Sequence, residues 1–459
     1  MAEPLKINSP IDDSLVGEVP AMSRDEVDAA IARVRSGQAA WAQQRIAERA
    51  TVVRGLAATL REAAEPRADL LIKEIGKTTD EAKSEVVRSV DLIEFSADEA
   101  ERLKDYEHKA EEFPNTEAGR VQRVTRVPHG VVLAIPPFNY PINLSVSKIA
   151  PALLMGNTVV FKPPRQGAVS AVAMVEAWRE AGLPTELLAV VTGDTSEIGD
   201  YLVQHDGIDA INLTGSDTVG RQVAEITTMK PLLLELGGND AAIVLDDADL
   251  ELAAKHIAGG AFKYAGQRCT AVKRVYAEAS IVDQLVTRLV TARNEQFGSA
   301  GDPREHPVGP VISDRQADYL EELLDDAKAK GGEVHCGGTR KGRFWEATVV
   351  SNVPHEARLV TEEQFGPILP IVPVKDADEA VAKANDSRYG LQASVFTADT
   401  KGAVRIADRL QAGGVHLNGP DQRGPDNFLF IGHKASGFGA QGVRYSLEAM
   451  SLPKAVIHN

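Results

Sequence analysis

Cysteine is scarce in this 459-residue chain, which contains only Cys269 and Cys336. Two distant cysteines cannot form the disulfide framework of a small secreted domain, and no Cys or His residues cluster at metal-ligand spacing. No apolar run reaches the roughly 18 residues needed to span a membrane. The opening residues, MAEPLKINSP, lack the basic and apolar regions of a signal peptide. These absences predict a cytoplasmic protein with no metal and no membrane partner.

Positive charge is also in short supply. The chain has 50 Lys+Arg against 66 Asp+Glu, giving a formal net charge of −16. Such a charge repels nucleic acid and anionic surfaces, so we expect no nucleic-acid partner. An anionic small substrate would require cations gathered at its own site. The 43% hydrophobic and 25% charged content is typical of globular proteins, and the length predicts several domains.

The part of the chain before residue 112 has helical periodicity. The segment Ser23-Arg24-Asp25-Glu26 fits a capping box, and helical spacing continues through 46–76 and 79–104. Residues 120–127 then alternate between polar and apolar, which predicts a strand in a protruding hairpin. The β-like run 454–457 could pair with this hairpin or with another subunit.

Short β-rich runs alternate with helical stretches in the middle of the chain. The predicted strands are Val131–Pro136, Thr158–Lys162, Leu188–Thr192, Ala210–Thr214 and Leu232–Leu236. This alternation is typical of βαβ units and a parallel sheet. A second α/β pattern over residues 237–415 predicts a second domain of similar size.

Cys269 is the first candidate for chemistry. It follows Gly266-Gln267-Arg268, between a predicted helix over 252–264 and a predicted strand over 272–277. A neighbouring cation such as Arg268 would lower the pKa of a thiol and make it a better nucleophile. A buried, inert cysteine is the alternative for the residue taken alone.

Three other features suit chemistry at a thiol. Glu235 lies in an apolar strand, which would raise its pKa and make it a general base near neutral pH. Asn139 follows Pro136-Pro137-Phe138 at a strand end, and its amide could stabilise an oxyanion. The turn Thr214-Gly215-Ser216, with Gly220 beyond it, could present backbone N–H groups to a phosphate. Each feature also has a structural alternative, as a salt-bridged glutamate, a turn asparagine or an ordinary turn.

Together these segments resemble the aldehyde dehydrogenase superfamily over nearly the whole chain. The segments are Pro137-Phe138-Asn139-Tyr140-Pro141, Phe161-Lys162-Pro163-Pro164, Thr214-Gly215-Ser216, Glu235-Leu236-Gly237-Gly238, Gly266-Gln267-Arg268-Cys269 and Glu363-Gln364-Phe365-Gly366-Pro367. Their order matches that of the family.

The resemblance implies an α/β fold of three parts. Residues 1–111 and 131–235 would form a Rossmann-like cofactor-binding domain, and 236–435 an α/β catalytic domain. Residues 112–130 and 440–459 would form a small β oligomerisation element. Family members are dimers or tetramers, so we expect a homo-oligomer.

The resemblance also implies the catalytic roles. Cys269 would attack the aldehyde carbon, Asn139 and the backbone N–H of Cys269 would hold the oxyanion, and Glu235 would activate the water that hydrolyses the thioester. Cofactor contacts would come from several positions carried over from the family motifs: Lys162, Gly215, Ser216, Gly220, Glu363 and Phe365.

Within the superfamily, the nearest resemblance is to the NADP-dependent, non-phosphorylating glyceraldehyde-3-phosphate dehydrogenases. That subfamily grips its small phosphorylated aldehyde substrate through positions that correspond here to Arg88, Tyr140, Arg268 and Arg423. Guanidinium groups suit phosphate, and they would supply the cations that the acidic chain otherwise lacks. At Arg165, many NAD-using relatives have a glutamate, so a cation there favours NADP, with NAD possible.

Three alternatives remain open from the sequence. The chain could oxidise another small aldehyde, such as lactaldehyde, because Gly419-Pro420-Asp421 departs from the subfamily pattern near the substrate pocket. It could be a CoA-acylating semialdehyde dehydrogenase, although Glu235 argues against that reaction. It could also be a non-catalytic NADP-binding protein.

Overall fold

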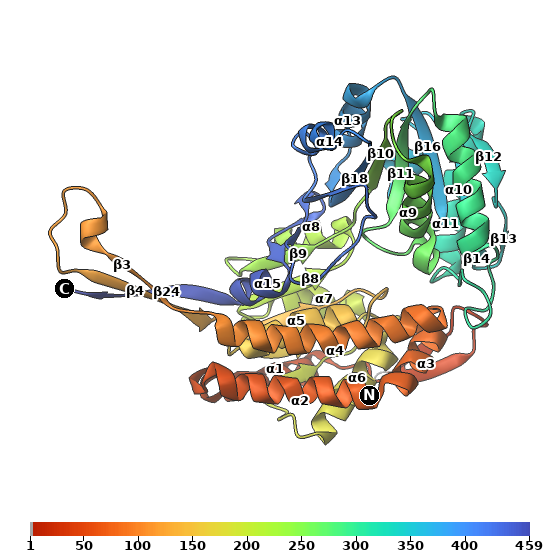
Figure 1. The fold of residues 1–459 in the computed structure, drawn as a ribbon. Helices are drawn as coiled ribbons and strands as arrows, with labels where there is room; N and C mark the ends of the chain where they lie inside the picture. The colour runs from red at the N-terminus through yellow and green to blue at the C-terminus, as the bar shows by residue number, and fades with distance from the viewer. Residues whose placement is uncertain (1–2) are drawn as a thin grey trace.

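The computed structural model describes residues 3–459 as two α/β bodies, one above the other, with a thin arm projecting to one side (Figure 1). The lower body in Figure 1 contains the N-terminal helices and the first sheet, and the upper body contains the second sheet. Two α/β bodies and a small β arm agree with the predicted α/β fold of three parts.

A six-stranded sheet, in the order β22-β9-β8-β5-β6-β7, forms the centre of the first body. Its strands are β5 (Val131–Ile135), β6 (Thr158–Phe161), β7 (Leu188–Val190), β8 (Ala210–Thr214), β9 (Leu232–Glu235) and β22 (Gly437–Phe438). All pairings are parallel except that of β22 with β9. The chain first adds β6 and β7 on one side of β5, and then β8 and β9 on its other side. A crevice therefore opens at the carboxyl ends of β5 and β8, where the strand order reverses.

Helices cover both faces of this sheet because its strands are apolar on both sides. Alternate residues of β5 separate the faces: Val131 and Leu133 pack on one core, and Val132 and Ala134 on the other. The helices are α1 (Arg24–Gln43), α2 (Ile46–Glu62), α3 (Ala64–Ile75), α4 (Thr79–Arg102), α5 (Asn143–Leu154), α6 (Ala168–Glu180), α7 (Thr195–Gln204), α8 (Asp217–Ile226) and α15 (Val443–Ala449). The helical pattern over 46–76 forms two helices, because Ala63 leaves the helical conformation.

A seven-stranded sheet, in the order β12-β15-β16-β11-β10-β18-β19, forms the second body. Its strands are β10 (Asp240–Val244), β11 (Val272–Glu278), β12 (Glu333–Cys336), β15 (Thr348–Ser351), β16 (Ile368–Val374), β18 (Gln392–Phe396) and β19 (Gly414–Leu417). Only β12 runs antiparallel to its neighbour. The helices of this body are α9 (Leu250–Phe262), α10 (Val282–Phe297), α11 (Asp314–Ala329), α12 (Arg358–Thr361), α13 (Ala377–Asn385) and α14 (Thr400–Ala407).

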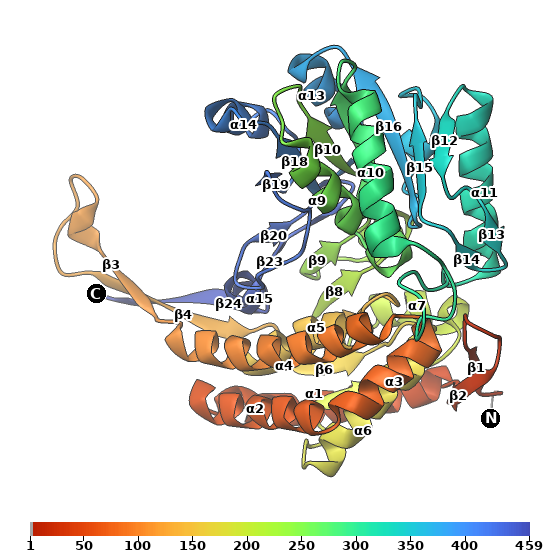
Figure 2. The same cartoon turned by 45° about the vertical axis from the view of Figure 1, so that its right-hand side comes forward.

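The arm is a three-stranded antiparallel sheet, in the order β24-β4-β3 (Figure 2). Its strands are β3 (Tyr106–Lys109), β4 (Val121–Pro128) and β24 (Ser451–His458). The C-terminal strand pairs with the hairpin along the full length of β4, from Ser451 opposite Pro128 to His458 opposite Val121. The sheet also includes β3, which lies before the boundary expected at residue 112.

The remaining elements are short. They are β1 (Leu5–Asn8), β2 (Leu15–Val19), β13 (Arg340–Lys341), β14 (Phe344–Trp345), β17 (Tyr389–Gly390), β20 (Phe430–Ile431), β21 (His433–Lys434), β23 (Ala440–Gln441), and the 3₁₀ turns Ala110–Glu112 and Lys263–Gly266. Among residues 3–459, no helix has both the length and the apolar character to cross a membrane.

Candidate active site

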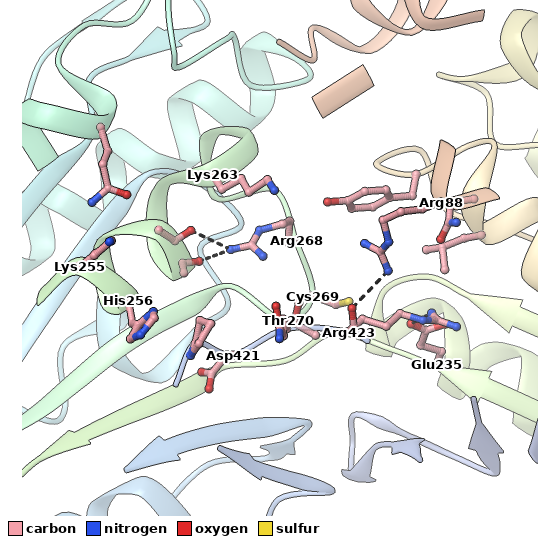
Figure 3. Close-up of a pocket in the computed structure, with 18 residues that line it drawn as sticks. Arg88, Glu235, Lys255, His256, Lys263, Arg268, Cys269, Thr270, Asp421 and Arg423 are labelled. Atoms are coloured by element: carbon pink, nitrogen blue, oxygen red, sulfur yellow. Dashed lines mark hydrogen bonds and ion pairs between the residues drawn. The ribbon is translucent and has the colours of Figure 1, made fainter. Parts of the chain in front are cut away.

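The two bodies meet around a cavity of about 320 Å³ that contains Cys269 in its wall (Figure 3). Glu235 from the first sheet and the 420–423 loop close other sides of the same cavity. Arg88, Tyr140, Arg268 and Arg423, all expected at the substrate site, line it as well. Tertiary folding therefore brings residues from five separate segments to one place.

The cysteine lies in a loop with unusual backbone geometry. After α9 ends at Phe262, three consecutive residues adopt left-handed conformations: Tyr264 at φ 55°, Ala265 at φ 50° and Gly266 at φ 70°. A Cβ at position 266 would lie 2.3 Å from the carbonyl oxygen of Gly366, so only glycine fits there. Such strained turns store energy at functional sites. This turn delivers Cys269 to the cavity before β11 begins at Val272.

Asn139 anchors the loop that carries the cysteine. Its side chain is 3% exposed, and Nδ2 donates a hydrogen bond to the carbonyl oxygen of Gln267 at 2.9 Å. The amide nitrogen has a second N–H, which is free of any partner within residues 3–459. Asn139 can therefore hold the loop with one N–H and offer the other to an oxyanion.

Glu235 is surrounded by donors. Its carboxylate accepts hydrogen bonds from Arg423 at 2.6 Å, Thr214 Oγ1 at 2.8 Å and Gln441 Nε2 at 2.9 Å. Burial alone would raise the pKa of this carboxyl, but the charges of Arg423 and Lys148 and the hydrogen bonds outweigh burial and lower it. The raised pKa predicted from the apolar strand is therefore wrong, because the strand end meets cations that are remote in sequence. Glu235 is ionised at neutral pH and able to accept a proton.

Lys148 is a buried member of the site that the sequence patterns did not reveal. Its Nζ donates to Thr214 Oγ1 at 2.6 Å and to Asn212 Oδ1 at 3.1 Å. Burial lowers the pKa of Lys148 to about 7, although the nearby Glu235 opposes this shift. A lysine inside the apolar helix α5 was the available signal, because a lysine is almost never fully buried without a partner.

The thiol is less acidic than its arginine neighbour suggested. Burial and the Glu235 carboxylate together raise the pKa of Cys269 to about 12, and the charges of Lys273 and Arg423 oppose this shift. Lys273 Nζ also donates to the carbonyl oxygen of Cys269 at 2.7 Å, which fixes the loop. The prediction that Arg268 makes this thiol acidic is wrong: its guanidinium instead turns toward backbone carbonyls of α9. In this structure, Cys269 is protonated and Glu235 is the ionised carboxylate in the same cavity.

The four predicted substrate residues differ in how they are held. Tyr140 lies with its ring over the ammonium of Lys77, which is 3.5 Å from the ring centre. Arg88 reaches Asp426 Oδ2 at 3.3 Å, whereas Arg268 bonds only to carbonyl oxygens. Arg423 is committed to Glu235, so its charge is already neutralised.

The predicted cofactor residues lie along the crevice of the first sheet and at its junction with the second body. Ser216 caps α8, its Oγ accepting from Val219 N at 3.3 Å. Gly220 allows α8 to pack closely, because a Cβ there would lie 2.4 Å from the Leu236 side chain. Gly215 donates its backbone N–H to the carbonyl oxygen of Glu235 at 3.1 Å. The turn therefore has a helix start directed at a candidate pyrophosphate position.

Two cations lie at the far end of this crevice. Lys162 is buried and donates to Thr195 Oγ1 at 3.2 Å, while Arg165 is exposed. Hydrogen bonds from Ser196 lower the pKa of Asp194, and the charges of Arg165 and Lys162 lower it further. Both cations therefore lie around the first turn of α7.

Glu363 and Phe365 approach from the second body. Glu363 Oε1 accepts from Gly238 N at 3.0 Å and lies 3.6 Å from Lys273 Nζ. Burial raises the pKa of Glu363, although Lys273 opposes the shift. Phe365 packs edge-on against Phe138, with ring centres 5.9 Å apart, so it lies next to the segment that carries Asn139.

The family comparison agrees with this geometry. The sequence model described as "Aldehyde dehydrogenase family" matches residues 2–456, and the chain belongs to that family. It is 44% identical over 456 residues to the NADP-dependent glyceraldehyde-3-phosphate dehydrogenase of Streptococcus equinus, covering 99% of this chain and 95% of the relative. The enzyme of the same name from Pisum sativum is 42% identical, with 96% and 89% covered.

A solved structure is similar over the whole chain. The crystal structure of NADP-dependent glyceraldehyde-3-phosphate dehydrogenase from Bacillus halodurans C-125, complexed with NADP, superposes with a TM-score of 0.98. It is 44% identical and covers 100% of this chain and 96% of its own. The positions of Cys269, Glu235 and Asn139 therefore lie in a fold that is shared with a characterised enzyme.

Proposed function

We propose that this protein oxidises D-glyceraldehyde 3-phosphate to 3-phosphoglycerate with NADP as the oxidant. One observation carries the proposal: a thiol and an ionised carboxylate line a cavity whose walls are otherwise rich in arginine and lysine, and an amide donor, Asn139, is hydrogen-bonded to the loop that carries the thiol. Nucleophile, base and oxyanion donor are the groups that acyl transfer requires. The similar proteins from Streptococcus equinus and Pisum sativum are named NADP-dependent glyceraldehyde-3-phosphate dehydrogenases.

The chemistry begins with the proton of the Cys269 thiol. Because the thiol is protonated and Glu235 ionised, Glu235 takes that proton as the sulfur forms a bond to the aldehyde carbon. The free N–H of Asn139 and the backbone N–H of Cys269 stabilise the oxyanion. When bound, the dinucleotide accepts the hydride of the aldehyde carbon. Cys269 then carries a thioester. Glu235 releases the thiol proton to solvent, takes a proton from the water that attacks the thioester carbonyl carbon, and returns this proton to the departing sulfur, which frees the carboxylic acid and the thiol.

The residues of the crevice fit a dinucleotide. Lys162 would contact the adenosine ribose, and Ser216, with the N–H groups at the start of α8, would hold the pyrophosphate. Glu363 would accept from the nicotinamide ribose, with Phe365 alongside. The raised pKa of Glu363 and its long contact to Lys273 indicate a carboxyl with hydrogen-bonding capacity to spare.

Arg165 gives the preference for NADP. Its exposed guanidinium, near Lys162, would meet the 2′-phosphate of the cofactor. We predict that Arg165→Glu lowers kcat/KM for NADP by at least about tenfold, which is the effect of losing one charge-assisted hydrogen bond. The ratio of kcat/KM values should therefore shift toward NAD. Steady-state kinetics with both cofactors measure this ratio. An unchanged ratio would show that Arg165 points into solvent.

A substrate panel tests the proposed reaction. NADPH formation should require an aldehyde, should be faster with glyceraldehyde 3-phosphate than with glyceraldehyde or lactaldehyde, and should need neither inorganic phosphate nor CoA. The Cys269→Ala variant should bind NADP but form no NADPH. A preference for an unphosphorylated aldehyde would support the alternative of a lactaldehyde-type enzyme, and a CoA requirement would support acyl transfer to CoA.

The arm supports a proposed homo-oligomer, either a dimer or a tetramer. Leu452, Val456 and Ile457 of β24 are exposed apolar side chains, and β24 forms one edge of the arm sheet. An exposed apolar edge strand is a ready template for pairing with a second copy. We further propose that the cofactor-binding domain ends and the catalytic domain begins at residue 235, between the two sheets. We also propose a cytoplasmic location, with which two free thiols are consistent.

A further inference from the structure

The cations around the cavity differ in whether a carboxylate already neutralises them. Arg423 pairs with Glu235 at 2.6 Å, and Arg88 reaches Asp426 at 3.3 Å. Lys263 and Lys255 line the same cavity, and neither has a carboxylate oxygen within 4.0 Å anywhere in residues 3–459. Two of the cations that line the cavity are therefore paired with carboxylates, and the two lysines are not.

Arg268 is the other cation without an acidic partner. Its guanidinium bonds to the carbonyl oxygens of Gly259 and Gly260, and its Nε has no hydrogen-bond partner although it is buried. Neutral carbonyls orient a guanidinium but leave its full positive charge, so Arg268 remains able to attract an anion.

Lys263 lies where its positive charge would add to that of Arg268. Its side chain is exposed at the end of α9, and it shares a second, smaller cavity with Arg88 and Tyr140. Figure 3 shows Lys263 next to Arg268 on one wall, with Arg88 on the opposite side, while Lys255 lies farther away beside His256.

The carboxylates that share the smaller cavity with Lys263 accept hydrogen bonds from other donors. Glu81 and Glu85 line the smaller cavity with it. Glu81 accepts the backbone N–H of Tyr264 at 2.6 Å and that of Thr78 at 3.1 Å. Glu85 is engaged by a buried lysine and by two backbone N–H groups at the start of α5. These carboxylate oxygens lie in other hydrogen bonds, and within residues 3–459 none is within 4.0 Å of the Lys263 ammonium, so a substrate anion at Lys263 would break no ion pair.

We infer that Lys263, acting with Arg268, binds the phosphate group of the substrate and so determines specificity for a phosphorylated aldehyde. This inference rests on the proposed function. It adds Lys263 to the arginines expected at this site, and unlike Arg423, which is paired with Glu235, Lys263 forms no ion pair within residues 3–459. An exposed ammonium beside an unpaired guanidinium offers two charge-assisted contacts to a dianion without breaking any pair.

Substitution of Lys263 tests this inference with little risk to folding, because the side chain is exposed. Lys263→Gln should lower kcat/KM for D-glyceraldehyde 3-phosphate by about tenfold to a hundredfold, mainly through KM, as expected for one charge-assisted hydrogen bond. Its kcat/KM for unphosphorylated glyceraldehyde should not change. Lys263→Arg should retain most of the activity with the phosphorylated substrate.

Lys255→Gln is the matched control, because Lys255 is an exposed lysine of α9, the helix that ends next to Lys263, and it lines the same cavity. It should change kcat/KM for the phosphorylated substrate by no more than about twofold, the size of a screened long-range effect. Equal losses in the two variants, or equal losses on both substrates in Lys263→Gln, would overturn the assignment of Lys263. A parent enzyme with no preference for the phosphorylated aldehyde would instead overturn the proposed function.

Discussion

At the scale of single residues, the site is organised by charge. Glu235 lies among Arg423, Lys148 and neutral donors, and the resulting field keeps it ionised despite complete burial. The same carboxylate raises the pKa of Cys269. The proposed base and the proposed nucleophile are therefore coupled: the negative charge that enables Glu235 to accept a proton also raises the pKa of the Cys269 thiol and keeps it protonated.

This coupling predicts opposite effects of Glu235→Gln on two measurements. Removing the negative charge should lower the pKa of Cys269, so its alkylation by iodoacetamide should become faster near pH 8 by about tenfold, or about one pKa unit. Turnover should fall by about a hundredfold or more, because thioester hydrolysis loses its base.

The sign of the pH dependence follows from the direction of the shift. The parent thiol, with its raised pKa, should be alkylated slowly at pH 7 and faster as the pH rises. The plot of alkylation rate against pH for Glu235→Gln should be shifted to lower pH. Both proteins are compared in a Cys336→Ser background, so that only one thiol reacts. Slower alkylation in the glutamine variant would mean that Glu235 activates the resting thiol instead of suppressing it.

At the scale of elements, close approaches between helices, strands and turns set the geometry. The start of α8 reaches the crevice only because Gly220 lets it lie against Leu236, directly after the strand that ends in Glu235. The left-handed turn after α9 has the same role for Cys269. Glycine is required in both places because backbone or packed side chains occupy the position of a Cβ.

Two glycine substitutions should therefore have opposite effects. Gly220→Ala should lower the free energy of unfolding by about 1–3 kcal/mol, the range for overpacking, and should weaken NADP binding by displacing α8. Gly55→Ala lies within α2 with open space around its Cβ position, and it should raise the free energy of unfolding by about 0.5–1 kcal/mol.

Urea unfolding and a fluorescence titration with NADP measure both effects. Gly55→Ala is the control, since it adds the same methyl group in a helix far from the crevice. Unchanged NADP affinity in Gly220→Ala would separate the packing of α8 from cofactor binding.

The sequence patterns predicted most elements because local periodicity determines them. The five parallel strands of the first sheet lie within the predicted runs, and the strand of the arm over 120–127 is confirmed as β4. The long pattern over 46–76 is interrupted at Ala63, because helical periodicity in the sequence continues across a one-residue break between two helices. The boundary at residue 112 missed β3, whose Tyr106-Glu107-His108-Lys109 is exposed throughout and has no apolar alternation to detect.

At the scale of the whole molecule, the arm stands apart from both bodies. Its strands bury little of their surface, and β24 has a single buried residue, Ser451. A strand that exposes apolar side chains on the monomer gains stability when a second copy covers them.

Ile457→Asp should therefore dissociate the proposed oligomer without unfolding the subunit. Ile457 is 52% exposed on the monomer, so a charge there is tolerated in isolation but is costly in an interface. Sedimentation velocity should show the parent as a dimer or tetramer and the variant shifted toward monomer.

Val404→Asp is the control, because Val404 is similarly exposed, at 50%, on a helix far from the arm. It should leave the sedimentation coefficient unchanged. If both variants keep the parent's assembly, the arm is not the contact that holds the subunits together.

The sequence alone determined the α/β class and the order of the strands along the chain, and it supplied the candidates for nucleophile, base and amide, because those depend on local periodicity and on short motifs. Only the tertiary structure decided which charges face one another. It set the directions of the pKa shifts at Glu235 and Cys269, added Lys148, committed Arg423 to a carboxylate and left Lys263 free among residues 3–459. Electrostatic interactions act through space between segments far apart in sequence, so no local pattern could have supplied them.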